Sequence, residues 1–170
     1  MCLNIWIFAN KQMNNLWTGP QVAQIVGITY DTLDYWLKSG LVKASIQGSK
    51  SRERSYYSFS DIVAIATIKT LRDSGFSLQK LKKASEELWQ KIGIRFEQGL
   101  RGGVVVADRN QLLAVLYTFG EAVQIMSLLQ GGQLVLPLDN IVSEIQQQVN
   151  LMSGGIDMDA QIEFPEKVNK

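Results

Sequence analysis

The chain has 170 residues, of which 46% are apolar, with one cysteine, no histidine, and 17 basic residues against 16 acidic ones. This composition is typical of a soluble globular protein of one or two small domains. The absence of histidine excludes a Ser/His/Asp triad, a Cys/His pair and an imidazole metal site. Cys2 alone can neither close an intramolecular disulfide nor supply the several thiolates of a metal site. We therefore expect no catalysis, no cofactor and no metal.

The charge is unevenly divided along the chain. Residues 1–83 contain 11 basic and 5 acidic residues, whereas residues 84–170 contain 6 and 11. Nine of the basic residues lie between Lys43 and Lys83. A basic half of this kind favours a polyanionic partner such as nucleic acid, although a solvated basic face has the same composition.

The first 16 residues are predicted to be an extension, with a possible strand over 3–8. Met1 to Trp17 lacks a basic start, and several Asn residues interrupt its short apolar run. Neither a secretory signal nor a membrane span has this pattern, so we expect a cytoplasmic protein that does not contact membranes. Met13 is a second possible translation start.

Two short helices are predicted next. Thr18 is a candidate N-cap, with Pro20 in the first turn and Gln21 at the capping-box position, and Gly27 ends the helix. Thr29 can cap the second helix, which places Leu33, Trp36 and Leu37 on one apolar face before Ser39 and Gly40 end it. This spacing is typical of a helix-turn-helix.

A basic hairpin wing and two further helices are expected to complete this domain. Short extended pieces over 41–46 and 55–59 flank a polar loop, which indicates the wing. Ser60 is the candidate cap of a third helix that ends at Gly75, and Ser77 that of a fourth, whose pattern breaks at Gly93. The residues expected to be buried in these helices are Ile62, Val63, Ile65, Ala66, Ile68, Leu71, Leu78, Leu81, Leu88 and Ile92.

The C-terminal half is predicted to be a small antiparallel sheet with one helix. Apolar segments with strand-like patterns cover 104–107, 111–117, 122–128 and 133–138. Asp139 can cap a helix that buries Ile141, Val142, Ile145 and Val149. The overall prediction is an α+β fold with four regions: an extension over 1–16, a winged helix-turn-helix domain over 17–92, an α/β module over 95–152 and a flexible acidic tail over 153–170.

The region from Trp17 to Leu88 resembles the MerR-type winged helix-turn-helix family. The segments that carry the resemblance are Thr18 to Ala23, Gly27 to Thr29, Thr32 to Trp36, Gly40 to Val42, Arg54, Tyr57 to Asp61, and Leu71 to Leu78. The resemblance implies a four-helix winged domain that binds double-stranded DNA as a two-fold homodimer and controls transcription. The whole chain is also similar to MerR-like bacterial antitoxins with a small C-terminal α/β module, and this implies a toxin as a possible partner.

Two positions depart from the family pattern. Asp34 stands where the family usually has an arginine that meets the DNA backbone, and a carboxylate there is repelled by phosphate unless it turns away or pairs with Lys38. The wing arginines usually precede the position of Tyr57 directly, whereas here Ser55 and Tyr56 occupy those places and the cations fall earlier.

The predicted DNA contacts lie on the first two helices and the wing. For the second helix the alternative is a packing role, and for the wing it is a solubilising loop. The candidates are Thr18, Gln21, Tyr30, Asp31, Thr32, Tyr35, Lys38, Lys43, Lys50, Arg52, Arg54 and Tyr56.

The sequence is compatible with three functions. The first is a sequence-specific, homodimeric transcriptional regulator. The second is an antitoxin whose C-terminal half neutralises a toxin while the DNA-binding half regulates its own operon. The third is a small-molecule enzyme built on the C-terminal sheet, which the absence of histidine and of an acid–base pair disfavours.

Overall fold

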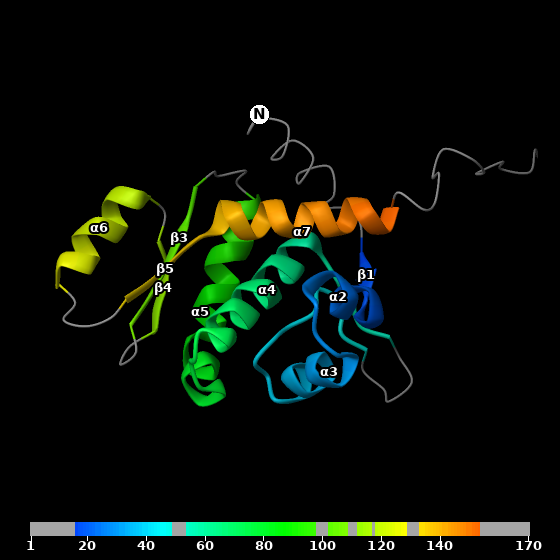
Figure 1. Ribbon diagram of the computed structural model, residues 1–170. Helices are drawn as coiled ribbons and strands as arrows, with labels where there is room; N and C mark the ends of the chain where they lie inside the picture. The colour runs from blue at the N-terminus through cyan, green and yellow to red at the C-terminus, as the bar shows by residue number, and fades with distance from the viewer. Residues whose placement is uncertain are drawn as a thin grey trace, which may run out of the picture.

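A computed structural model of the chain describes residues 16–48, 54–97, 102–108, 112–116, 118–128 and 133–153. Its helices and strands form an α+β fold, as predicted (Figure 1). The predicted strand over 3–8, most of the wing loop and almost all of the acidic tail lie outside the described residues.

The N-terminal region begins with β1 (Trp17–Thr18), α2 (Gly19–Val26) and α3 (Tyr30–Lys38). Both predicted caps are correct in position: Thr18 precedes α2, and the Thr29 Oγ1 accepts the Thr32 N–H at 3.1 Å. Gly27 ends α2 in the left-handed conformation, with φ at 73°, which glycine adopts without steric penalty. The predicted helix-turn-helix is confirmed.

The wing strands are shorter than predicted. β2 (Tyr56–Tyr57) pairs antiparallel with β1, and Ile46 meets Tyr56 in an isolated bridge with N–H···O distances of 3.0 and 2.8 Å. Among the residues that the structure describes, the segment after Gly40 pairs with β2 at this bridge, and its first two residues, Leu41 and Val42, are buried in the core.

Two long helices follow, α4 (Phe59–Asp73) and α5 (Leu78–Glu97). The prediction of Ser60 as the cap of the third helix is wrong, because Ser58 forms a capping box with Asp61 and starts α4 earlier. The fourth helix does not break at Gly93. It continues to Glu97, with Ile92 buried in the core just before the glycine.

The C-terminal sheet has the order β4 (Leu112–Leu116), β3 (Val104–Asp108), β5 (Gln133–Pro137), and both pairings are antiparallel. The predicted strand over 122–128 is wrong, since α6 (Phe119–Leu128) occupies this segment. A capping box starts α6: Glu121 Oε2 accepts the Thr118 N–H at 3.0 Å, and Thr118 Oγ1 accepts the Glu121 N–H at 3.2 Å.

The final helix, α7 (Leu138–Ser153), packs back onto the N-terminal helices α2 and α4 (Figure 1). Asp139 does not cap α7, because the helix begins one residue earlier at Leu138, whose N–H donates to Gly103 O at 2.7 Å. The predicted buried residues of α7, namely Ile141, Val142, Ile145 and Val149, are all in the core.

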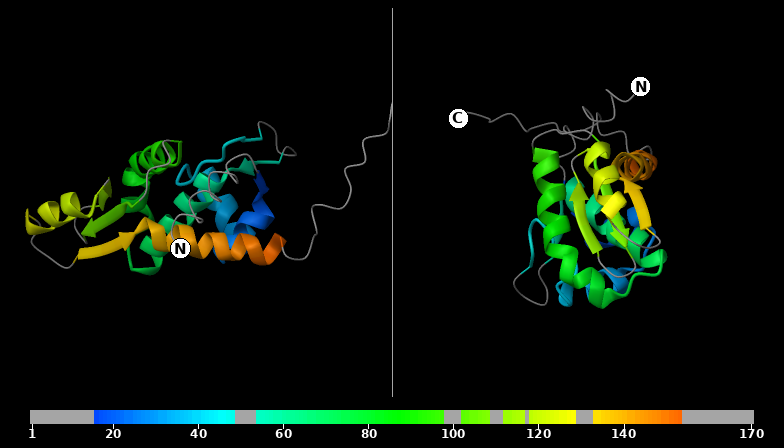
Figure 2. Two further views of the ribbon diagram at one scale, coloured as in Figure 1. Left: turned by 90° about the horizontal axis from the view of Figure 1, so that it is seen from above. Right: turned by 90° about the vertical axis from the view of Figure 1, so that its left-hand side faces the viewer.

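The two faces of the sheet have different neighbours. Val105, Ala107, Leu134 and Leu136 join the main core formed by α2, α4, α5 and α7. The opposite face, with Val104, Val106 and Val135, packs against Ala122 and Met126 of α6. The sheet therefore lies between α6 and the helical body of the molecule (Figure 2).

Candidate nucleic-acid interface

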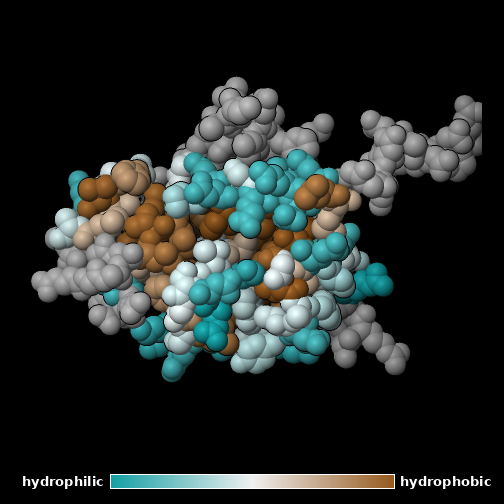
Figure 3. Space-filling view, in the orientation of Figure 1, coloured by the Kyte–Doolittle hydropathy of each residue, from teal (hydrophilic) through white to brown (hydrophobic). Residues whose placement is uncertain are grey.

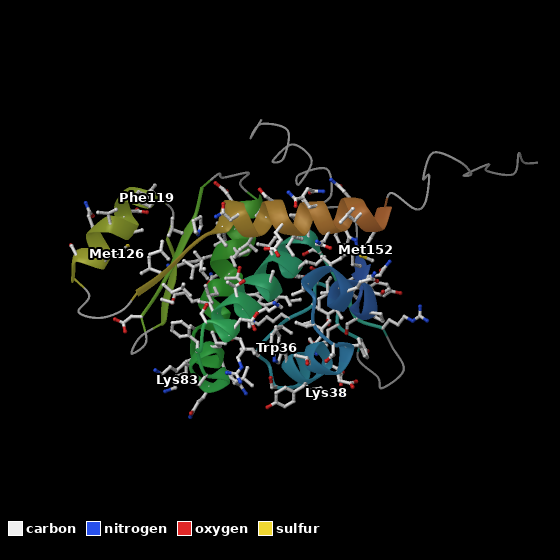
Figure 4. The ribbon with its side chains drawn as sticks, in the orientation of Figure 1. Trp36, Lys38, Lys83, Phe119, Met126 and Met152 are labelled. Carbon is white, nitrogen blue, oxygen red and sulfur yellow. The ribbon has the colours of Figure 1, made fainter. Side chains whose placement is uncertain are left out.

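The orientation of α3 is set by its buried side. Leu33 and Trp36 are in the core, and Leu37 packs against it. Figure 4 shows Trp36 on the inner side of α3 and Lys38 on its outer side. Because one stripe of α3 is fixed in the core, the opposite stripe must face outward.

The outward stripe of α3 contains most of the predicted contact residues of this helix. Tyr30 is 52% exposed and Tyr35 is 58% exposed, and Asp31 and Lys38 are exposed as well. Thr32 is less exposed than these residues. Its Oγ1 lies 2.7 Å from Thr29 Oγ1, so this hydroxyl already has a local hydrogen-bond partner. Tyrosine, aspartate and lysine side chains are therefore exposed on this surface.

Asp34 and Lys38 form an ion pair along α3. Lys38 Nζ donates to Asp34 Oδ2 at 2.6 Å, one turn apart on the helix. This hydrogen bond, together with the attraction of the carboxylate, raises the pKa of Lys38. The carboxylate that departs from the family pattern is thus neutralised by the cation four residues further on, one of the two arrangements that the sequence allowed.

Thr18 and Gln21 are linked at the start of α2. Gln21 Oε1 accepts hydrogen bonds from the Thr18 N–H and the Thr18 hydroxyl, each at 2.9 Å. Gln21 is exposed and Thr18 is half-buried. The carboxamide oxygen is therefore engaged within the helix start, and the amide group of Gln21 is the part that remains to meet a phosphate.

A close approach couples the starts of α2 and α3. A Cβ atom at Gly19 would lie 2.8 Å from Cε2 of the Tyr30 ring. Since real Cβ atoms essentially never come this close to a neighbour, only glycine at position 19 allows the ring to occupy its present place. The first side chain of α3 is thus positioned against the first residue of α2.

The wing residues are only partly described. Arg54 is exposed and Tyr56 is half-buried in β2, whereas Lys50 and Arg52 lie outside the described residues. Lys43, at the other side of the wing, is exposed, and its Nζ lies 3.2 Å from Glu86 Oε1 of α5. Exposed ion pairs of this kind are weak, so Lys43 can exchange Glu86 for a phosphate at small cost.

Asp61 is a residue that the sequence reasoning did not single out as a site residue. It is 6% exposed, and its Oδ2 accepts the Ser45 N–H at 2.9 Å, the Ser45 hydroxyl at 2.5 Å and the Ser58 N–H at 2.9 Å. Its Oδ1 accepts the Trp89 Nε1–H at 3.3 Å. One carboxylate therefore joins the base of the wing to α4 and α5, and the Ser58-x-x-Asp61 spacing was the signal for it.

The elements that carry the described part of the predicted interface meet at α2. Both α3 and the short β1–β2 pair contact this helix, so the elements that carry Thr18, Gln21, the outer stripe of α3 and Tyr56 are neighbours. Within the described ranges no three His, Cys, Asp or Glu side chains are grouped so that they could hold a metal ion. None of the described helices combines the length and apolarity that crossing a bilayer requires.

Comparison with known proteins agrees with this geometry. Residues 18–88 match the profile of the MerR HTH family regulatory proteins. The chain is also 37% identical over 116 residues to two proteins named as uncharacterized HTH-type transcriptional regulators, one from Mycobacterium bovis and one from Mycobacterium tuberculosis. Each match covers 68% of this chain and 48% of the relative, so the chain spans about half the length of these relatives.

The similarity to these relatives extends beyond the helix-turn-helix region. A continuous match of 116 residues in a chain of 170 must include residues 55–116, wherever it starts. It therefore covers α5, β3 and β4 in addition to α4. The passage from the fourth helix of the winged domain into the sheet is thus shared with these relatives.

Proposed function

We propose that the chain is a sequence-specific DNA-binding transcriptional regulator that acts as a homodimer, because residues 18–88 match the family of MerR helix-turn-helix regulatory proteins. The observation that supports this most strongly is the family match over a region that includes the α2–α3 helix-turn-helix. We expect the protein to be cytoplasmic and to have no catalytic activity.

In this proposal α3 enters the major groove. Residues near the start of α3, namely Tyr30, Asp31 and Thr32, reach base edges, while Tyr35 and Lys38 lie along the backbone. The start of α2, with Thr18 and Gln21, meets a phosphate. The wing residues Lys43, Lys50, Arg52, Arg54 and Tyr56 hold the flanking backbone.

Two-fold symmetry determines the DNA site. Two α3 helices related by a two-fold axis bind half-sites whose centres lie about 34–36 Å apart along the duplex, which predicts a palindromic operator. Each phosphate neutralised by a cation contributes about −0.9 to the slope of log K against log salt concentration. Binding is therefore expected to weaken steeply with added salt.

Fluorescence anisotropy tests the proposal. Purified protein is titrated onto DNA from upstream of its own gene and onto a scrambled duplex of the same composition, across a salt series. We expect clear preference for the native sequence, and weaker binding with a shallower salt slope for the variant with Arg52→Ala and Arg54→Ala. Equal affinity for both duplexes would contradict sequence-specific regulation.

A second candidate function is that of an antitoxin, and one observation favours it. Phe119 and Val123 of α6 are exposed on the acidic half of the chain, where an apolar protein partner could bind. Co-expression with the product of an adjacent gene tests this candidate. An antitoxin is expected to reverse the growth arrest caused by that product, and Phe119→Ser is expected to weaken the reversal while DNA binding is kept.

A further inference from the structure

The C-terminal sheet has one edge at β5. In the order β4-β3-β5, the outer edge of β5 pairs with no other strand among the described residues. The other end strand, β4, is packed against α5. Unpaired strand edges carry rows of backbone donors and acceptors and readily accept another strand.

The hydrogen-bond phase of the sheet shows which backbone groups face outward. Leu138 N–H donates to Gly103 O at 2.7 Å, and the β3–β5 register continues this pairing with Val105 opposite Leu136 and Ala107 opposite Leu134. In an antiparallel ladder, hydrogen-bonded pairs alternate with pairs whose N–H and C=O groups face away. The outward groups of β5 therefore belong to Gln133, Val135 and Pro137, and Pro137 offers only its carbonyl.

The sequence of β5 does not protect this edge with charge. The strand, Gln-Leu-Val-Leu-Pro, contains no charged residue, although edge strands are commonly protected by lysine or by inward-pointing charges. Apolar side chains gather over α6 and the adjacent strands (Figure 3), and Phe119 and Val123 of α6 are 68% and 49% exposed. An apolar, uncharged edge beside an apolar helix suits a strand partner with the same properties.

We propose that β5 of a second copy of this chain pairs antiparallel with this edge, around a two-fold axis through Val135. The two Val135 residues exchange both N–H···O bonds, and each Gln133 N–H donates to the Pro137 carbonyl of the other copy. The absent N–H of Pro137 ends the ladder where the chain turns into α7. The result is a six-stranded sheet. This interface rests on the proposed function, because it forms the homodimer that is proposed there.

Symmetry favours a second copy over an unrelated strand. A two-fold axis brings each residue of β5 near its own equivalent, and no like charges meet because the strand is uncharged. A two-fold axis perpendicular to the sheet keeps the same face of the sheet on the same side in both copies. Both α6 helices therefore lie on one side of the six-stranded sheet, and both winged domains lie on the other. Two DNA-binding domains on the same side are what binding of a single duplex requires.

Amide hydrogen exchange of the full chain, measured by NMR, tests the pairing directly. Leu134 and Leu136 serve as internal controls because their N–H groups face β3 within the same subunit. We expect the Val135 N–H to be protected to within about tenfold of these controls, with protection falling on dilution. A Val135 N–H that exchanges as fast as an unstructured peptide, while Leu134 and Leu136 remain protected, would overturn the interface.

Cysteine cross-linking gives a second measurement. In a Cys2→Ser background, Val135→Cys places two thiols on the axis, where paired Cα atoms lie about 5.5 Å apart, within the range of a disulfide. We expect most of the oxidised protein to form a covalent dimer, whereas Gln147→Cys, exposed on α7, is expected to form little. Equal dimer yields for the two variants would count against the pairing.

DNA binding separates this inference from the proposed function. A chain that cross-links through position 135 but shows no preference for its upstream DNA would leave the interface standing and contradict the proposed regulator. A chain that binds a half-site with sequence preference, yet is monomeric at every concentration tested, would overturn the interface and the homodimer but leave the sequence-specific DNA binding of the proposed regulator standing.

Discussion

The ion pair between Asp34 and Lys38 decides how much positive charge α3 presents outward. Lys38 Nζ lies 2.6 Å from the Asp34 carboxylate, so the lysine is held by its own helix in the free protein. A phosphate that approaches Lys38 must compete with this carboxylate and is repelled by it. We therefore expect the aspartate to lower the affinity of α3 for the DNA backbone, whatever the DNA sequence.

Asp34→Asn tests this competition. We expect severalfold tighter binding at low salt and a salt slope steeper by about 0.9, because one more cation becomes available for a phosphate. Glu87→Gln is the matched control, since it removes the carboxylate of another ion pair of the same spacing, with Lys91 on α5. Unchanged affinity in Asp34→Asn would show that Lys38 does not approach the backbone.

Tyr57 gives the protein a defined sensitivity to alkaline pH. Its side chain is buried beside α4, and burial raises its pKa to about 12. The unfolded chain has a tyrosine pKa of about 10, so the neutral phenol contributes stability below pH 10, and this stability is lost as the pH rises through 12. We expect urea unfolding to show a smaller loss of stability between pH 10 and 12 in Tyr57→Phe than in the wild type.

At the scale of the elements, Asp61 joins three parts of the winged domain. Its carboxylate accepts hydrogen bonds from the segment after α3, from the start of α4 and from Trp89 of α5. Asp61→Asn keeps the shape but loses acceptors for buried donors, so we expect about 1.5–3 kcal/mol of destabilisation in urea unfolding. Ser60→Ala, one residue earlier in α4, is expected to change stability much less.

The elements also show where the sequence is informative. The helix-turn-helix and the buried faces of α4 and α7 were predictable because caps and 3.6-residue periodicity agree there. In 122–128 the residues Ala-Val-Gln-Ile-Met-Ser-Leu are apolar enough for either a strand or a helix, and the Thr118-x-x-Glu121 capping box was the signal for α6. The sequence predicted which side of α3 faces outward. It did not decide whether Asp34 pairs with Lys38 or turns away.

At the scale of the whole molecule, the return of α7 onto α2 and α4 depends on long-range packing. Local patterns predicted the apolar face of α7 but not which element it meets, because many apolar surfaces in the chain could bury it. The core is continuous from Val22 of α2 to Val149 of α7. The predicted boundary between regions 17–92 and 95–152 is therefore crossed by one core. Whether the two regions unfold together can be measured.

Ile145→Ala measures that coupling. Ile145 is 3% exposed in the shared core, so its truncation is expected to destabilise the protein by about 2–5 kcal/mol. Because the core is continuous, we expect calorimetry to show one transition that shifts as a whole, with DNA binding lost at the same temperature. Gln147→Ala, exposed on the same helix, is the control, and two separate transitions would indicate independent regions.

The contact between Gly19 and Tyr30 has a consequence for evolution. Tyr30 is half-exposed, so its ring can swing away from a new Cβ atom at position 19 with little loss of stability, but it would then leave its place at the start of α3. Selection for DNA binding, rather than for folding, would therefore maintain this glycine. Among related sequences we expect covariation: a residue larger than glycine at position 19 should accompany a small side chain at position 30.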